Sequence, residues 1–335
     1  MGGDTGTHLD SFRAEGVQMG RPRTTLYVVA CALVLVACAS DGAEPTGGGG
    51  SRNPVSPSTS FPVTVEGSNG SVTIQDRPTR IVSLSPTGTE DLFAIDAGDQ
   101  VIAVDDRSNF PSDAPVTDLS GFEPNIEAIA SYEPDLVVYS TEIGDLGSSL
   151  RSVGLTALQL DAPVTLEDAY EQIEQLGIAT GHQDEAEVVV AGMRAEVDSI
   201  VESVGPAEGL TFYYELDDTF YSVTSDTFIG QLFSLLGLEN IADAAGKGSG
   251  GYPQLSAEYI VEADPDLIFL ADTKCCGQSP RTVANRPGWN TIAAVENGNV
   301  VPLDDDVASR WGPRVVDLLR AVADAANAAA DEAAA

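Results

Sequence analysis

The sequence predicts an α/β protein of two similar lobes, each with a mostly parallel sheet flanked by helices, joined by one long helix. Three observations support this: a repeated phrase, an alternation of strands with helices, and a long amphipathic stretch between the two copies. Residues 126–138 and 257–269 share a glutamate, an isoleucine, an acid, Pro-Asp-Leu and an aliphatic pair at the same offsets. Each copy has the pattern of a short helix, a Pro-Asp turn and a buried strand. Two lobes enclose a cleft, where small ligands commonly bind; chance similarity between two common units is the alternative.

The amino terminus has the features of an export signal. Residues 26–37 are apolar and follow two arginines, but the run is shorter than the roughly 20 residues that span a bilayer. It ends in Leu-Val-Ala-Cys, which resembles a lipoprotein signal box and makes Cys38 the expected lipidation site. An ordinary cut near Ala39 is the alternative. We therefore expect residues 1–37 to be a signal peptide, with its true start at Met19, because the preceding residues contain acids that are unusual in such signals.

The composition after the signal separates a tether from a folded body. Residues 38–62 are rich in Gly, Ser, Pro and Thr and include four consecutive glycines, so they cannot bury enough apolar surface to fold. We expect them to be a lipid-anchored flexible tether. The rest of the chain divides into an expected N-terminal lobe (63–182), a connecting helix (183–204), a C-terminal lobe (205–325) and a frayed alanine-rich tail (326–335).

The first half of the body shows strands and helices in alternation. An Asn-Gly pair at 69–70 between two apolar stretches predicts a β-hairpin. After it, apolar runs predict strands at 81–84, 101–104, within the first repeat copy, and at 157–160. Helices are expected from about 86 to 95, over 146–153, and from a capping sequence at 165–168. This order implies a mostly parallel sheet with helices on its faces.

The second half repeats the pattern after the clearest helix of the chain. Residues 183–204 place their apolar side chains on one face at helical spacing, as expected for the connector. Strands are predicted at 210–214, within the second repeat copy, and at 300–302. Helices are predicted over 228–236 and from Arg314 onward.

Charge and cysteine content exclude some functions. The formal net charge is −36, so neither nucleic acid nor an anionic lipid surface is an expected partner. Beyond the signal and Cys38, the only cysteines are the adjacent Cys275 and Cys276. They could form a strained vicinal disulfide, remain free thiols or contact a ligand. A metal site is disfavoured, because there is no C-x-x-C motif and no histidine nearby.

The sequence lacks a convincing catalytic set. His182 is the only histidine after the signal and lies at an expected helix boundary, where a structural role is the simpler interpretation. Residues 246–251 match G-x-G-x-x-G but lack the preceding strand and following helix of a dinucleotide site, which favours a flexible loop. The acids at 304–306 lack calcium-loop spacing. An enzyme is therefore disfavoured.

Three motifs resemble those of ABC-importer substrate-binding proteins for iron chelates and vitamin B12. They are Arg-Ile-Val-Ser-Leu-Ser-Pro from residue 80 with Thr-Glu at 89–90, the phrase at 125–137, and Trp289 with Ala-Val-Glu-Asn-Gly from residue 294. Together they span about residues 79–322. The resemblance implies two α/β lobes joined by a long helix that allows only modest closure. It also implies docking on a membrane permease through one acid per lobe, here Glu127 and Asp226; a solvated helix residue is the alternative for Glu127.

Ligand contacts are expected from loops that border the cleft. Aromatic residues offer broad, stiff contact to a macrocycle, and arginines pair with anionic groups. Tyr213 and Tyr214 point to opposite faces of a strand, so at most one faces the cleft; several of these residues could instead belong to the core. The expected ligand-binding residues are Arg107, Phe110, Phe122, Tyr214, Tyr221, Tyr252, Cys275, Cys276, Arg310 and Trp311.

The sequence therefore predicts an extracytoplasmic, lipid-anchored, monomeric substrate-binding protein that delivers a metal chelate to an ABC permease. No cofactor is expected beyond the cobalt or iron within the ligand. A corrinoid, a ferric siderophore and haem remain open; the aromatic loops favour the corrinoid, and Arg107 with Arg310 would suit an anionic siderophore. An exported enzyme and a structural or adhesive lipoprotein are the alternative functions.

Overall fold

The computed structural model describes residues 60–333 except 206, 208 and 247, and these lie within one compact unit, Pro54–Ala335. The expected signal peptide, Cys38 and most of the expected tether lie outside the described residues. Among those described, no helix is both long and apolar enough to cross a bilayer.

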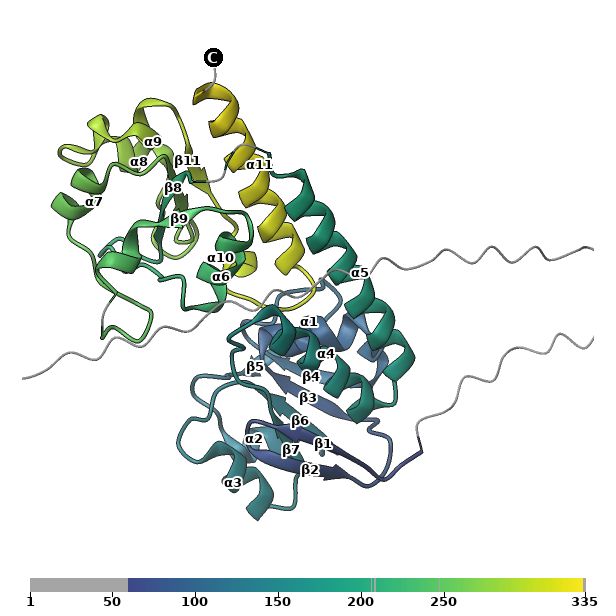
Figure 1. Ribbon diagram of the computed structural model, residues 1–335. Helices are drawn as coiled ribbons and strands as arrows, with labels where there is room; N and C mark the ends of the chain where they lie inside the picture. The colour runs from purple at the N-terminus through teal and green to yellow at the C-terminus, as the bar shows by residue number, and fades with distance from the viewer. Residues whose placement is uncertain (1–59, 206, 208, 247, 334–335) are drawn as a thin grey trace, which may run out of the picture. The chain divides into compact units, whose positions relative to one another are not determined.

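The N-terminal lobe contains a hairpin and a five-stranded parallel sheet (Figure 1). The hairpin consists of β1 (Val63–Gly67) and β2 (Gly70–Ile74), which confirms the predicted hairpin, with Ser68 and Asn69 as its turn and Gly70 as the first residue of β2. The sheet has the order β5-β4-β3-β6-β7, with all four neighbouring pairs parallel. Its strands are β3 (Ile81–Leu84), β4 (Val101–Asp105), β5 (Val116–Leu119), β6 (Leu136–Tyr139) and β7 (Ala157–Gln159). Its helices are α1 (Pro86–Ala94), η1 (Gly98–Gln100), α2 (Ile126–Ala130), α3 (Leu146–Ser152) and α4 (Leu166–Thr180).

The C-terminal lobe contains a four-stranded parallel sheet of the order β11-β10-β8-β9. Its strands are β8 (Thr211–Glu215), β9 (Glu239–Asn240), β10 (Leu267–Leu270) and β11 (Val300–Pro302). Its helices are α6 (Phe228–Leu235), η2 (Ile241–Ala244), α7 (Ala257–Ala263), α8 (Pro280–Ala284), η3 (Trp289–Thr291), α9 (Ala293–Glu296), α10 (Asp305–Ala308) and α11 (Val315–Ala333). Phe212, Phe233 and Phe269 form an aromatic core on one face of this sheet, with ring centroids 4.7–6.3 Å apart.

The repeated phrase has the same structural role in both lobes. In the N-terminal lobe, Asp135 accepts hydrogen bonds from the backbone amides of Thr79 (2.8 Å) and Arg80 (3.0 Å). In the C-terminal lobe, Asp266 accepts from the amide and the hydroxyl of Thr211, both at 2.8 Å. Each aspartate thus ties its own strand to the start of the lobe's first sheet strand. The repeat is a structural unit used twice.

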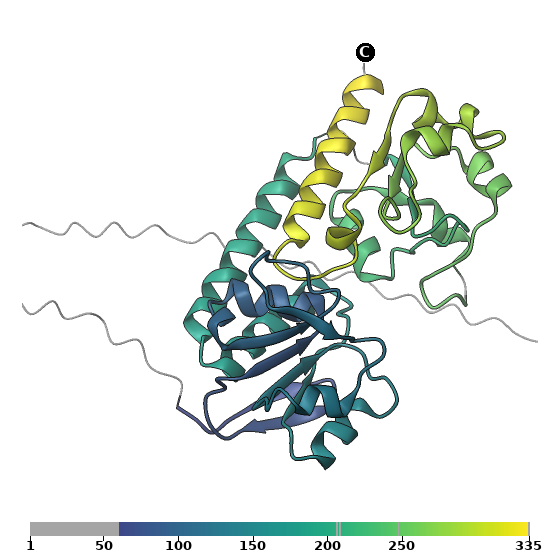
Figure 2. The same cartoon turned by 180° about the vertical axis from the view of Figure 1, so that it is seen from behind.

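Two long helices lie side by side, one reaching from the N-terminal lobe to the C-terminal lobe and the other packed against the C-terminal lobe (Figures 1 and 2). The connector α5 (Gln183–Ser203) ends one residue before the predicted end and buries the predicted apolar face. The second is α11, and its Asn327 donates to the carbonyl of Ser203 (3.3 Å) and accepts from the amide of Gly205 (3.1 Å).

The expectation of a frayed tail from residue 326 is wrong as far as residue 333. The helix α11 continues to Ala333, and Ala326, Ala329 and Ala330 are buried. Alanine has the highest helix propensity, and its short side chain allows close approach to a neighbouring element.

Candidate functional site

A cavity of about 390 Å³ lies between the lobes, bordered by Pro163 of the N-terminal lobe and mainly by C-terminal residues. Leu216 directly follows β8 and Ala271 directly follows β10, so the carboxyl ends of two parallel strands open onto it. Ligands of parallel α/β sheets bind at this edge. We refer to this space as the interlobe cavity.

The wall of the interlobe cavity is mostly apolar and carries three large aromatic side chains, those of Phe228, Tyr252 and Trp311. Tyr252 is 53% exposed, which leaves its ring accessible. Trp311 lies on the segment before α11, and its indole nitrogen donates to the Gln172 side chain of α4 at 3.1 Å. That hydrogen bond fixes the indole against the N-terminal lobe. The pair can offer stiff aromatic contact to a flat or macrocyclic ligand.

Cys275 reaches the interlobe cavity from a tightly held loop. Asp305, which also lines the cavity, accepts hydrogen bonds from the amides of Thr273 (2.9 Å), Lys274 (2.8 Å) and Cys275 (3.0 Å). Both Cys275 and Cys276 are free thiols. Desolvation, followed by the adjacent Cys276, raises the pKa of Cys275 to about 12, so its thiol is neutral at physiological pH. Cys276 is half-buried and does not line the cavity.

Arg310 also lines the interlobe cavity, but its guanidinium is already engaged. Its Nη1 donates to Glu90 of α1 at 2.8 Å, and Nη2 lies within 3.1 Å of the Arg107 carbonyl, the Asn109 amide oxygen and Asp306. Glu90 also accepts hydrogen bonds from Arg314. Arg310 thus lines the cavity while it is paired with a buried carboxylate of the other lobe, and its role as a ligand contact stays a prediction.

The structure places the other expected contact residues elsewhere. Tyr214 is fully buried, and its hydroxyl donates to the Ala308 carbonyl at 3.2 Å, so it lies behind the cavity wall. Phe110 lies in a separate hollow of about 370 Å³, with the Arg314 guanidinium 4.1 Å above its ring. The side chains of Arg107, Phe122 and Tyr221 are exposed and do not line the interlobe cavity.

Several residues of the cavity wall were not among the expected contacts. These are small or aliphatic residues on either side of the strand ends, such as Leu216, Val223, Ile229 and Ala308. Such residues look like core positions in a sequence. Their one usable signal is that Leu216 and Ala271 each lie two residues after the end of a predicted strand.

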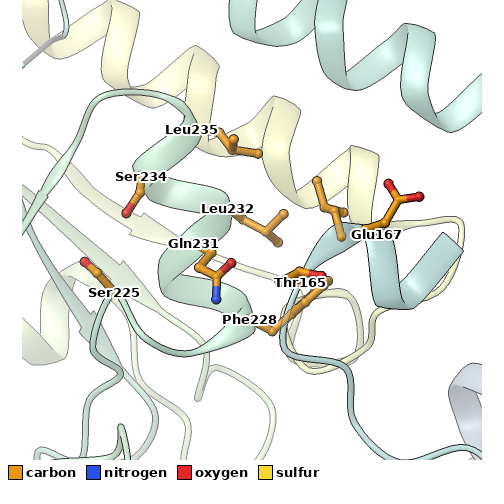
Figure 3. A pocket seen from close by; sticks show the side chains of 9 residues that line it. Thr165, Glu167, Ser225, Phe228, Gln231, Leu232, Ser234 and Leu235 are labelled. Atoms are coloured by element: carbon orange, nitrogen blue, oxygen red, sulfur yellow. The ribbon is translucent and has the colours of Figure 1, made fainter. Parts of the chain in front are cut away.

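A second hollow of about 470 Å³ lies on the flank of α6 (Figure 3). Phe228 and Leu232 of α6 point from one side toward Thr165 and Glu167 at the start of α4. Phe228 lines both this hollow and the interlobe cavity. The flank hollow lacks the strand ends, Tyr252 and Trp311, so we assign the candidate site to the interlobe cavity.

Both expected docking acids are exposed. Glu127 lies in the first turn of α2, and Asp226 directly precedes the N-cap Thr227 of α6. Asp226 borders an open hollow of about 570 Å³ that also includes Gly248 and Gly250. Among the described residues, which do not include Lys247, neither carboxylate is found in an ion pair. Their role in docking stays a prediction.

A buried polar cluster lies beneath the Cys275 loop. Glu215 is fully buried and accepts two hydrogen bonds of 2.6 Å from Arg286, whose guanidinium lies 4.5 Å from the Trp289 ring centre. Asp272 is also fully buried, and neither of its carboxyl oxygens has a hydrogen-bond partner among the described residues. Burial and the neighbouring Glu215 raise the pKa of Asp272 to about 7. In the described part of the chain, no three His, Cys, Asp or Glu side chains gather as a metal site would require.

Comparison with known proteins is consistent with this arrangement. The chain is 30% identical to an uncharacterised ABC transporter substrate-binding lipoprotein of Bacillus subtilis, over 79% of this chain and 85% of that one. It is 30% identical to a cobalamin-binding protein of Halobacterium salinarum, over 79% of this chain and 74% of that one. The apo form of a periplasmic heme-binding protein from Roseiflexus sp. RS-1 has the same fold, with a TM-score of 0.67, 22% identity, and coverage of 76% and 99% of the two chains.

The model of one protein family, described as periplasmic binding protein, matches residues 81–307. The match covers both sheets, the connecting helix and the strand ends that border the interlobe cavity. Members of this family serve transport rather than catalysis. The chain therefore belongs to the periplasmic binding protein family.

Proposed function

We propose that this protein is the extracytoplasmic substrate-binding lipoprotein of an ABC importer, and that it captures a metal chelate in the interlobe cavity. The cavity at the carboxyl ends of β8 and β10, with Tyr252 and Trp311 in its wall, carries this proposal. The names of two relatives support the ligand class, since one binds cobalamin and one binds haem. A corrinoid, haem or a ferric siderophore is the cargo.

The metal enters as part of the ligand and needs no binding set of its own. The interlobe cavity contributes one carboxylate, Asp305, and one thiol, Cys275, to its wall. Asp305 is engaged by backbone amides, and the Cys275 thiol is held neutral by its raised pKa. Recognition through apolar and aromatic contact to the organic ring suits a metal whose coordination the chelator already supplies.

The location follows from the amino-terminal sequence. A lipid on Cys38 would hold the folded body at the outer face of the cytoplasmic membrane, and the glycine-rich tether would let it reach a permease. Replacing Cys38 with serine should release the protein from the membrane fraction while leaving ligand affinity unchanged. Retention of Cys38→Ser in the membrane fraction would contradict lipid anchoring through this residue.

Docking uses Glu127 on the N-terminal lobe and Asp226 on the C-terminal lobe. Both carboxylates are exposed at the start of a helix, where they can meet cationic side chains of a permease. The double variant Glu127→Ala with Asp226→Ala should bind ligand normally yet fail to support uptake. Glu258, exposed on α7 at the equivalent place in the repeat, supplies a matched control that should leave uptake intact.

Calorimetric titration against cobalamin, haem, a ferric hydroxamate and a ferric catecholate tests the ligand class. Saturable 1:1 binding to one of these identifies the cargo. Tyr252→Ala should then weaken that binding by about tenfold or more, because a large aromatic contact in a cavity wall is lost. Absence of binding to all four would refute the metal-chelate assignment.

A further inference from the structure

The charged groups around the interlobe cavity are arranged in an unexpected way. Arg310 is the one cation among the described residues that line it, and its side chain is only 7% exposed. The Glu90 carboxylate that pairs with it is 1% exposed and belongs to α1 of the other lobe. Arg310 also meets Asp306 at 3.1 Å. The positive charge of Arg310 is therefore paired with two carboxylates, those of Glu90 and Asp306.

The neighbouring cations are compensated as well. Arg314 shares Glu90 with Arg310, and Lys274 contacts Asp304 at 2.5 Å and Asp306 at 2.7 Å. Asp305 lines the cavity and accepts its hydrogen bonds from backbone amides and the Thr273 hydroxyl.

Across this group, the carboxylates of Glu90, Asp304, Asp305 and Asp306 outnumber the cations of Lys274, Arg310 and Arg314. These seven named groups sum to one negative charge, within a chain of net charge −36.

An anionic ligand that took the place of Glu90 at Nη1 of Arg310 would have to displace that carboxylate. That exchange would leave a buried carboxylate without its partner, and an uncompensated charge of this kind is strongly unfavourable. A neutral or cationic ligand can bind while the ion pair between Arg310 and Glu90 stays intact. The long-range field of the protein acts in the same direction, because it repels anions from the cavity mouth.

We propose that Glu90 is a specificity-determining residue: by holding Arg310 in a buried ion pair between the lobes, it makes the cavity select neutral or cationic metal chelates over anionic ones. The inference rests on the proposed function, since it concerns the charge of the chelate that the interlobe cavity accepts. It reverses the expectation from sequence that Arg310 serves an anionic siderophore. Glu90 acts through Arg310 and the charge of the wall, without a ligand contact of its own.

A charge series on two scaffolds tests the proposal with the chain from residue 38 onward, carrying Cys38→Ser. The corrinoid series is cyanocobalamin (neutral), aquacobalamin (cationic) and a cobalamin monocarboxylate (anionic). The iron series is ferrioxamine B (cationic), its N-acetyl derivative (neutral) and its N-succinyl derivative (anionic). On the scaffold that binds, the anionic member should be weaker than the neutral one by about tenfold or more at low salt, since one uncompensated charge within several ångströms has this effect.

The variant Glu90→Gln should reduce that discrimination, because it frees a positive charge at Arg310 while nearly preserving shape. The matched control is Glu167→Gln, which also removes one carboxylate from an arginine pair, but at an exposed site, with side chains 44% and 56% exposed. Glu90→Gln should narrow the ratio of neutral to anionic affinity by about tenfold, whereas Glu167→Gln should leave the ratio unchanged.

A second variant covers the case in which Glu90→Gln does not fold. In Arg310→Gln, the ratio of neutral to anionic affinity should stay as it is in the parent, because Arg310 is not offered to anions there. A selective tenfold loss of anionic affinity in Arg310→Gln would overturn the proposal, as would a parent protein that prefers the anionic member of either series. Absence of binding to all six probes would instead overturn the proposed function itself.

Discussion

The buried carboxyl of Asp272 should make the stability of this protein fall as the pH rises toward neutrality. Asp272 is fully buried, and neither of its oxygens has a hydrogen-bond partner within the described residues. Glu215 lies beside it and accepts two 2.6 Å hydrogen bonds from Arg286. Burial and the Glu215 charge together raise the pKa of Asp272 to about 7.

The sign of the effect follows from proton linkage. The unfolded chain releases the Asp272 proton near pH 4, whereas the native state keeps it up to about pH 7. Between these values the native state binds more protons, so its stability decreases as the pH increases. Three pKa units correspond to about 4 kcal/mol, and relaxation of the buried pair reduces this to about 2–4 kcal/mol by pH 8.

The perturbation that isolates this effect is Asp272→Asn. Asparagine has the same shape as protonated aspartic acid and cannot ionise. At pH 5 the variant and the parent should therefore unfold with free energies within about 1 kcal/mol of each other, whereas at pH 8 the variant should be more stable by about 2–4 kcal/mol. Urea denaturation followed by circular dichroism, at constant ionic strength, measures both differences.

Asp266→Asn is the matched control, because the carboxylate of Asp266 accepts two hydrogen bonds from Thr211 in the same lobe. It should destabilise the protein at pH 8. If Asp272→Asn also destabilised the protein at pH 8, or if its effect were equal at the two pH values, Asp272 would be ionised in the native state. The argument from burial would then be wrong.

Three further predictions concern the stability of the fold: a helix cap, the aromatic core of the C-terminal lobe, and the aspartates of the repeated phrase. Thr165→Ala removes the hydroxyl that accepts a hydrogen bond from the Asp168 amide at the N-cap of α4, and should lower the free energy of unfolding by about 0.5–2 kcal/mol; equal stability in urea would contradict the capping role. Phe233→Ala empties the centre of the aromatic core and should cost about 3–5 kcal/mol, against less than about 1.5 kcal/mol for Phe233→Leu. Asp135→Ala and Asp266→Ala should each cost about 1–3 kcal/mol by leaving strand amides unpaired, and a large effect in only one lobe would refute the equivalence of the repeats.

The fold was predictable because its signals are local. The apolar run at 81–84 and the Asn-Gly pair each specify one element, and the strand and the hairpin were both found at those residues. The edge strand β5 (Val116–Leu119) was missed, since Val116 is 53% exposed and the strand pairs irregularly with β4. A strand with one partner and a solvated face lacks the continuous apolar run that marks a buried strand.

The candidate site was predictable only in part. Tyr252, Cys275 and Trp311 line the interlobe cavity, because loops after parallel strands meet at one edge of a sheet. Tyr214 illustrates the limit: alternation along β8 places either it or Tyr213 on a given face, and the sequence does not say which face meets the cavity. The ion pair of Arg310 with Glu90 could not be predicted from the sequence either, because Glu90 lies 220 residues earlier in the chain.

The alanine-rich end of the chain has a practical consequence for handling the protein. Its composition suggests a dispensable tail, yet Ala326, Ala329 and Ala330 are buried, and Asn327 is bonded to the segment that ends α5. The helix α11 is thus packed against the connector α5 and hydrogen-bonded to its end. A truncation before residue 327, or a bulky side chain in place of Ala326, should loosen that connector. Affinity tags and reporter fusions at this end therefore need a spacer after residue 335.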